Sequence, residues 1–297
     1  MLVKNKFNQS VIYVLANILG EIVYSNDENC IIIDSLNNIF DTDHLMKISM
    51  ATDSVSLVRT KVQGYSYCII SITGDGIGKH YELMLIEDNV FACSEKLVRG
   101  MEKYIEILNS EKDNRSNNDM SNLINNIVDY IKSLNYDGKI ISNIEKETIG
   151  YIDAEFFTAL ILNAITILHE FGNKKDIYIH SNTVKYGTRI VLSTSSENEK
   201  EIYGIYDFCR EYPYVSSLCV LARVACNQKG IEMILQQKNG KIEFELIFPS
   251  SKEVEFGVYN KHNKEISVEI REAFSFIIDE GIENLLVNTQ SYIYESQ

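Results

Sequence analysis

The first ninety residues alternate short apolar runs with polar breaks. Residues 11–24, VIYVLANILGEIVY, form two β-branched runs around a turn at Asn17–Gly20, and residues 55–73 and 79–87 form later runs of the same kind. Short runs rich in Val, Ile and Tyr that are bounded by turn residues are typical of β-strands. The pattern predicts two early strands, small helices after them, and three late antiparallel strands.

A glycine-rich stretch, Gly74-Asp75-Gly76-Ile77-Gly78, lies between the last two of these runs. It resembles a phosphate-binding loop, but such a loop must open a helix, whose free N–H groups bind the anion. Residues 79–87 instead alternate like a strand. We therefore expect a β-hairpin, in which the glycines supply positive φ angles.

The middle of the chain changes to helical spacing. Apolar residues recur every three or four positions within residues 93–110 and again from Met120 to Leu134, and the wholly polar residues 111–119 lie between them as a candidate linker. Two amphipathic helices joined by a polar break can form a helical hairpin that dimerises into a four-helix bundle. The sequence therefore predicts a homodimer that forms through residues 94–134.

Residues 136–250 alternate helices with strand pairs, which predicts an α+β fold. A helix follows Asp153, a suitable N-terminal cap, and a strand pair turns at Tyr186-Gly187. A second helix stops at Gly230, and a hairpin turns at Asn239-Gly240. The chain then continues into residues 251–297, of which 271–286 have helical spacing.

Composition excludes several classes of function. The 28 basic and 42 acidic residues give a net charge of −14, which argues against nucleic acid or anionic membranes as partners. The six cysteines form no Cys-x-x-Cys pair, so we expect no metal site. No apolar stretch approaches the 18 residues of a membrane span, and we expect a cytoplasmic protein.

Two regions resemble known families. The runs YVLANILGEIVYSN and YCIISITGDGIGKHYELMLIEDN resemble a PAS sensor domain. Residues 120–250 resemble the ATP-binding domain of bacterial sensor histidine kinases, the GHKL fold, with Asn163-Ala164-Ile165 at the Asn-Ala position of its asparagine-bearing helix. The resemblance implies a PAS-like sensor domain, a helical dimerisation segment, a GHKL-type α/β sandwich and a C-terminal extension, at 1–92, 93–135, 136–250 and 251–297.

The residues that would bind ATP are mostly missing. The resemblance implies an asparagine pair, an Asp-x-Gly-x-Gly loop and a second glycine-rich loop. Here Ala159 replaces the first asparagine, residues 192–196 contain neither Asp nor Gly, and residues 214–218 contain no Gly. Lost hydrogen bonds and strained loops of this kind weaken binding by roughly 10²–10⁴-fold. Asn163 is therefore interpreted as a vestigial cofactor position that is no longer used, and no cofactor is expected.

The phosphoacceptor of a histidine kinase is also missing. No histidine lies between His80 and His169, so the predicted helical hairpin has none, and no catalytic residue is assigned. His169-Glu170 does not continue into the zinc motif His-Glu-x-x-His. Asp41, Asp43 and Asp75 could pair as acid and base, but solvated carboxylates are the simpler interpretation.

The sequence therefore predicts a non-catalytic, pseudokinase-like regulator in two-component signalling or a phosphorelay. Its partner would be a sensor kinase, a phosphotransferase or a response regulator, and the sporulation phosphorelay is an analogy of this kind. Two alternatives remain open: a divergent active histidine kinase or phosphotransferase, and a dimeric small-molecule sensor.

Overall fold

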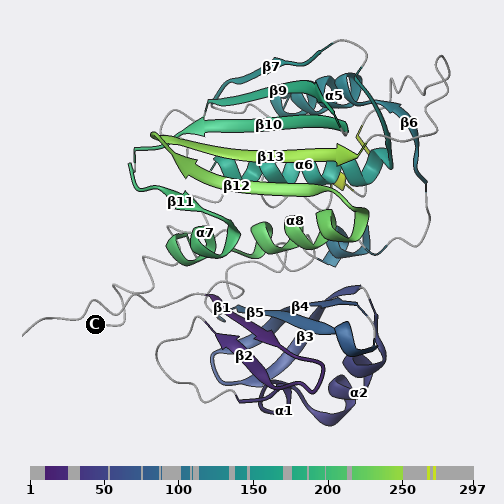
Figure 1. Ribbon diagram of the computed structural model, residues 1–297, viewed down its shortest axis with the longest axis vertical. Coiled ribbons are helices and arrows are strands. Elements are labelled where there is room, and N and C mark those ends of the chain that lie inside the picture. The colour runs from purple at the N-terminus through teal and green to yellow at the C-terminus, as the bar shows by residue number, and fades with distance from the viewer. Residues whose placement is uncertain are drawn as a thin grey trace, which may run out of the picture. The chain divides into compact units, whose positions relative to one another are not determined.

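Contacts divide the chain into two compact units, which we describe separately (Figure 1). The first unit holds strands β1 to β5 and the second holds β6 to β13. The computed structural model describes residues 11–25, 34–52, 54–74, 76–86, 88, 102–107, 109, 114–133, 138–145, 148–169, 176–185, 187–197, 199–212, 216–249, 266–267 and 270–271.

The first unit is a five-stranded antiparallel sheet in the order β2-β1-β5-β4-β3. Helices α1 (Leu36–Ile39) and α2 (Thr42–Met50) lie between the second and third strands of the chain. The predicted series of two early strands, short helices and three late strands is confirmed. The strands are β1 (Val11–Ala16), β2 (Ile22–Ser25), β3 (Ser54–Val62), β4 (Tyr65–Thr73) and β5 (His80–Ile86).

Alternate residues of these strands build the core of the first unit. Successive side chains of a strand point to opposite faces, so every second residue of β1, β4 and β5 enters the same cluster. The helices close this cluster with Leu36, Ile39, Phe40 and Ile48. The strand residues in the core are Ile12, Val14, Ala16, Cys68, Ile70, Ile72, Tyr81, Leu83 and Leu85.

The second unit contains a six-stranded sheet in the order β11-β12-β13-β10-β9-β7. All its pairs are antiparallel except the parallel pair of β7 and β9. The predicted hairpin turn joins β12 to β13, with φ of 52° at Asn239 and 66° at Gly240. The strands are β7 (Ile140–Asn143), β9 (Ile177–Val184), β10 (Gly187–Ser195), β11 (Ile202–Tyr203), β12 (Glu232–Lys238) and β13 (Lys241–Pro249).

Helices cover one face of this sheet. Helix α6 (Ala154–His169) contacts β9, β10 and β13, and Figure 1 shows it running behind the strands. The rings of Phe157 on α6 and Phe248 on β13 lie 5.3 Å apart between centroids. Other labelled helices of this unit are α5 (Met120–Ser133), α7 (Ile205–Glu211) and α8 (Ser216–Lys229), and the described residues 102–107 are helical as well. The predicted α+β class is confirmed.

Among the described helices, none is both long and apolar enough to span a membrane.

A small two-stranded ladder corrects the predicted linker. Residues 116–119, which lie within the polar stretch 111–119, form strand β6 (Ser116–Asp119) and pair with β8 (Ile149–Ile152). Strand pairing uses backbone groups, so polar side chains do not prevent it, and Asn118 Nδ2 also donates to the carbonyl oxygen of Ile152 at 2.7 Å.

The apolar stripe of α5 packs within the second unit. Its helix contacts α6, β7 and β8 of the same unit. The dimer through residues 94–134 stays a prediction, but the stripe that suggested it is covered by the chain itself. The buried residues of α5 are Met120, Leu123, Ile124, Ile127, Val128 and Ile131.

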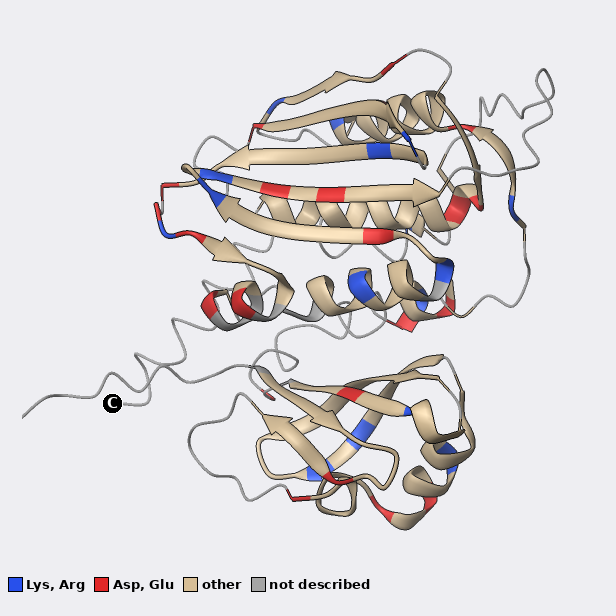
Figure 2. Cartoon of the chain, in the orientation of Figure 1, with Lys and Arg blue, Asp and Glu red and all other residues tan. Residues whose placement is uncertain are grey.

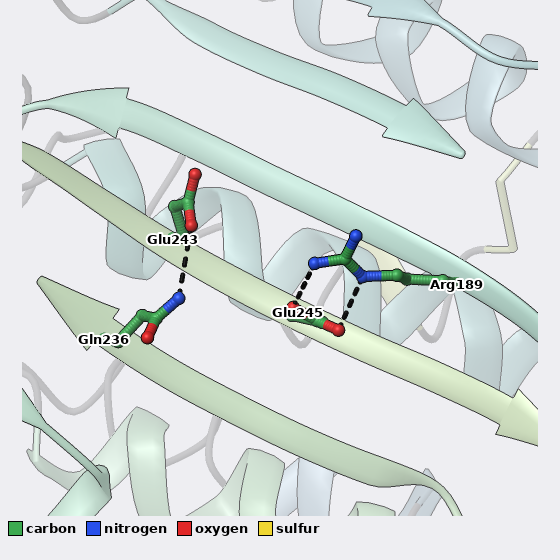
Figure 3. Close-up of polar contacts among 4 residues, drawn as sticks. All are labelled: Arg189, Gln236, Glu243 and Glu245. Carbon is green, nitrogen blue, oxygen red and sulfur yellow. Dashed lines mark hydrogen bonds and ion pairs between the residues drawn. The ribbon is translucent and has the colours of Figure 1, made fainter. Parts of the chain in front are cut away.

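Polar side chains form ladders on the other face of the six-stranded sheet (Figure 3). Arg189 Nε and Nη2 donate to Glu245 Oε1 and Oε2, both at 2.6 Å, and Gln236 Nε2 donates to Glu243 Oε2 at 3.2 Å. The two hydrogen bonds to Glu245 raise the pKa of the Arg189 guanidinium above its usual range. Glu245 is only 8% exposed, so its carboxylate depends on this two-point contact.

We predict that Arg189→Met lowers the free energy of unfolding by about 1–3 kcal/mol, because it leaves a mostly buried carboxylate without its partner. Urea unfolding followed by circular dichroism measures the loss. The control is Arg189→Met combined with Glu245→Met, which removes both charges and recovers part of the stability. A single variant as stable as the parent would contradict the prediction.

We also predict that Gly150→Ala destabilises the second unit by about 1–3 kcal/mol. A Cβ atom at Gly150 would lie 2.4 Å from Sδ of the buried Met120. Thermal unfolding measures the loss, and Gly78→Ala, where a Cβ meets nothing within 4 Å, is the control that stays near the parent. If both variants have the same melting temperature, the close approach of Gly150 to Met120 does not limit stability and the prediction is wrong.

Candidate functional site

Helix α6 carries Asn163, the candidate site residue from the sequence. The helix begins as predicted, because Asp153 Oδ1 accepts from the backbone N–H groups of Glu155 at 2.9 Å and Phe156 at 3.0 Å. Residues 156–168 are then all buried. A helix that is buried on every side has no face left for solvent, and Asn163 is 0% exposed.

The side-chain amide of Asn163 bonds to two other segments of the chain. Its Nδ2 donates to the hydroxyl of Tyr104 at 3.1 Å and to the carbonyl oxygen of Leu218 on α8 at 3.0 Å. Its Oδ1 is buried and, among the described residues, meets no hydrogen-bond donor. The amide thus faces protein atoms on its donor side. Ala159, one turn earlier, is 0% exposed as well.

Tyr104 is the residue that sequence reasoning missed. It lies in the helical residues 102–107 and is 2% exposed. Burial raises the pKa of its hydroxyl above the usual range, while the hydrogen bond from Asn163 lowers it and the nearby Cys226 thiol raises it. The hydroxyl is therefore neutral at physiological pH. The helical spacing in the sequence marked Ile105 as apolar, but nothing linked Tyr104 to Asn163.

The position of the expected Asp-x-Gly-x-Gly loop is occupied by strand. Strand β10 stays paired with β13 as far as Ser195, which lies opposite Lys241, and the N–H of Ser196 donates to the carbonyl of Gly240 at 2.8 Å. Thr194 Oγ1 donates to the carbonyl of Asp176 at 2.9 Å. These hydroxyl and backbone groups are engaged within the fold.

The expected second glycine loop precedes α8. Of residues 214–218, Tyr214 and Val215 lie outside the described residues, and Ser216 already begins the helix. The carbonyl of Leu218, in the first turn of α8, is the acceptor for Asn163. The start of α8 is thereby tied to α6.

The glycine stretch of the first unit is a hairpin connection, as predicted. Strands β4 and β5 pair up to Thr73 and His80, and Gly76–Gly78 form one 3₁₀ turn. Asp75 lies outside the described residues. Gly74 has φ of 79°, and a Cβ atom there would lie 3.0 Å from the carbonyl oxygen of Gly78, so only glycine fits this bend.

The lysine after this hairpin binds a helix end. Lys79 Nζ donates to the carbonyl oxygens of Ser49 at 2.7 Å and Ile48 at 3.4 Å, in the last turn of α2. It also lies 5.5 Å from the centre of the Tyr81 ring. A cation at the negative end of a helix is stabilising. Lys79 therefore serves packing within the first unit.

The other residues considered as acids, bases or metal ligands do not form a common site among the described residues. Asp41 caps α2, where Oδ1 accepts from the N–H of His44 at 2.9 Å, and this bond lowers the pKa of Asp41. His169 ends α6, while its neighbour Glu170 lies outside the described residues. In the described part of the chain, no group of three His, Cys, Asp or Glu side chains is arranged to hold a metal ion.

No protein-family model and no curated protein sequence matches this chain. Among solved structures, the histidine kinase AdeS of Acinetobacter baumannii is similar, with a TM-score of 0.43 and 10% identity over 52% of this chain and 77% of that one.

Two further solved structures are similar. The ATP binding domain of PrrB from Mycobacterium tuberculosis has a TM-score of 0.39 and 12% identity, over 47% of this chain and all of that one. The blue-light activated histidine kinase EL346 of Erythrobacter litoralis has a TM-score of 0.35 and 9% identity, over 82% and 96%. The predicted resemblance to sensor histidine kinases is thus found again among solved structures.

We predict that Lys79→Met destabilises the first unit by about 1–3 kcal/mol, because the last carbonyls of α2 lose a charged donor. Urea unfolding measures the loss. Lys47→Met is the matched control on the same helix, where the exposed lysine changes stability by less than about 0.5 kcal/mol. A phosphate-binding role would instead appear as stabilisation of the parent protein by millimolar inorganic phosphate.

Proposed function

We propose that this chain is a histidine-kinase-like signalling regulator that acts through protein–protein contacts and does not use ATP. In this proposal the first unit is a PAS-like sensor and the second is a GHKL-type domain without a working nucleotide site. Its targets are sensor kinases, phosphotransferases or response regulators of a two-component system or phosphorelay.

The observation that carries this proposal is the engagement of Asn163. In the family that the sequence resembles, the asparagine holds magnesium beside the phosphates of ATP. Here both hydrogen bonds of its Nδ2 go to protein oxygens, on Tyr104 and Leu218, and the residue is 0% exposed. Magnesium would bind this amide through Oδ1, which is buried as well, so a nucleotide would have to open the packing around Asn163 before any metal reached it.

The missing loops support the same proposal. Residues 192–195 are paired strand, and Ser196 is bonded to the turn of the β12–β13 hairpin. A loop that reaches adenine would require the end of β10 to separate from β13. The lost acceptor and the lost glycines together correspond to roughly 10²–10⁴-fold in affinity.

The absence of a phosphoacceptor histidine from residues 94–134 favours a role without phosphotransfer. His80 is on β5 of the first unit and His169 ends the buried helix α6. Neither position is in a helix that could present a histidine to a kinase and then to a response regulator.

The first unit supports a sensory role through its sheet order, β2-β1-β5-β4-β3, with short helices inserted after the second strand. Two strands, short helices and three further strands follow one another as the sequence predicted for this PAS-like region. On the described elements Lys and Arg are scattered among Asp and Glu (Figure 2), which favours protein partners over nucleic acid.

Isothermal titration of the purified chain with Mg-ATP tests the loss of nucleotide binding. We expect no saturable heat up to millimolar ATP, because the amide and the strand that would contact the nucleotide are engaged within the protein. An active histidine-kinase ATP-binding domain is the positive control. A micromolar Kd that Asn163→Ala abolishes would instead establish the divergent active kinase.

Binding measurements against a panel of response-regulator receiver domains, phosphotransferases and kinase cores from the same source organism test the signalling role. We expect micromolar binding to at least one of them, without transfer of phosphate from radiolabelled ATP. If none binds and the protein is a dimer, the small-molecule sensor is the better description.

A further inference from the structure

The sheet of the first unit has two apolar faces. Alternate residues of its strands enter the core cluster on one face, and the strand register places the residues between them on the other, here called the second face. Tyr13, Met84 and Ile69 form one row across the second face and are only 5%, 0% and 1% exposed. An antiparallel sheet with one face in water carries polar residues there, so this second face is not built for solvent.

The described helices of the first unit serve the opposite face. The buried residues of α1 are Leu36 and Ile39 and that of α2 is Ile48, and all three belong to the core cluster with Ile12, Val14 and their neighbours. Helices α1 and α2 therefore cannot account for the burial of the Tyr13, Met84 and Ile69 row. The second face needs a different cover.

The second face also carries a buried carboxylate. Glu82 lies between Leu15 and Ser71 in the next row and is 5% exposed, and the buried Ser71 Oγ has no hydrogen-bond partner among the described residues. Arg59, a basic residue of the same face, lies over the ring of Tyr67 at 5.8 Å. A buried carboxylate is stable where donors contact it, and cationic donors bind it most strongly. A cover that suits this face combines apolar side chains with a cation that reaches Glu82.

Residues 1–10, MLVKNKFNQS, have this composition. They contain the apolar residues Leu2, Val3 and Phe7, two lysines, and no acidic residue, although the whole chain is strongly acidic. Residues 271–286 are also rich in apolar residues, but they carry four acidic residues and one basic residue and would bring like charge to Glu82. Charge therefore favours residues 1–10 as the cover.

The same segment joins the sheet at the second face. It runs directly into β1, whose first residue, Val11, pairs with Ile86 and has the register of Tyr13 on this face. Glu82 lies opposite Leu15, four residues further along β1, which is about 13 Å from Val11 along the strand. The five residues from Val11 back to Lys6 span up to about 17 Å when extended. The segment is thus long enough to fold back over the face and bring a lysine to Glu82.

We propose that the second face of the first unit's sheet is a docking surface and that residues 1–10 occupy it. Phe7 packs against the row of Tyr13, Met84 and Ile69, and the lysines of the segment supply the cation for Glu82. The proposal concerns the first unit alone, so it stands whether or not the second unit binds ATP.

Photo-crosslinking in the full chain tests the occupant. Phe7→p-benzoylphenylalanine places a benzophenone in the segment, which on irradiation bonds to neighbouring C–H groups and reacts readily with methionine. We expect an intrachain crosslink to the peptide that contains Met84 or Ile69, found by mass spectrometry in the band of the monomer. The same probe at Leu19, which is 76% exposed in the β1–β2 turn, is the control that gives no such crosslink.

A peptide with the sequence of residues 1–10, titrated into a chain that lacks them, tests the chemistry of the contact. We expect saturable binding, weakened roughly 10- to 100-fold by Glu82→Gln, because a charged acceptor for the lysines is lost. Glu21→Gln, at an exposed position of the same unit, is the matched control and leaves the affinity unchanged. If the shortened chain does not fold, Glu82→Gln in the full chain is assayed by crosslinking from position 7, and a lower yield at Met84 or Ile69 is expected.

Three outcomes would overturn the proposal. Crosslinks from position 7 that reach only residues of the second unit would assign the segment elsewhere, and crosslinks found only in a dimer band would make a second copy the occupant. A folded, shortened chain that binds the peptide no better than a scrambled peptide of the same composition would show that the face does not recognise this segment.

Discussion

The complete burial of α6 is the constraint on which the second unit depends. Thirteen successive residues of this helix, 156–168, are buried, so the sheet on one side and the other helices must supply everything that its side chains need. Water cannot reach a polar group at the centre of such a helix. Asn163 is therefore bonded to oxygens of Tyr104 and Leu218, and a position that the resemblance assigns to a ligand is used for structure.

The need to pair polar groups inside the protein also explains how β10 ends. A nucleotide loop must leave the sheet and expose backbone N–H groups, whereas a strand keeps them paired. Here β10 continues to Ser195 opposite Lys241, and Thr194 donates to the carbonyl of Asp176. The sheet gains continuity and loses the free donors that phosphates require. In both places donor groups are bonded inside the protein: Nδ2 of Asn163 and the backbone N–H of Ser196.

Local patterns predicted much of this fold, because they depend on neighbouring residues. Strand alternation gave the sheet of the first unit, Asp153 marked the start of α6, and Asn239-Gly240 marked a hairpin. Strand β6 was missed, since its polar residues pair through their backbone. The contact of Tyr104 with Asn163 joins residues far apart in the sequence, so no local pattern could indicate it.

The two halves of the Asn163 amide therefore have different consequences. The donor half is satisfied twice, which stabilises the packing of α6 against α8 and residues 102–107. The acceptor half is buried without a donor from the described residues, and a buried oxygen without a donor costs stability. An apolar side chain at this position would remove that cost, but it would also remove the donor for Tyr104 and Leu218. The asparagine is therefore explained by the two bonds of its donor half, which join α6 to α8 and to residues 102–107.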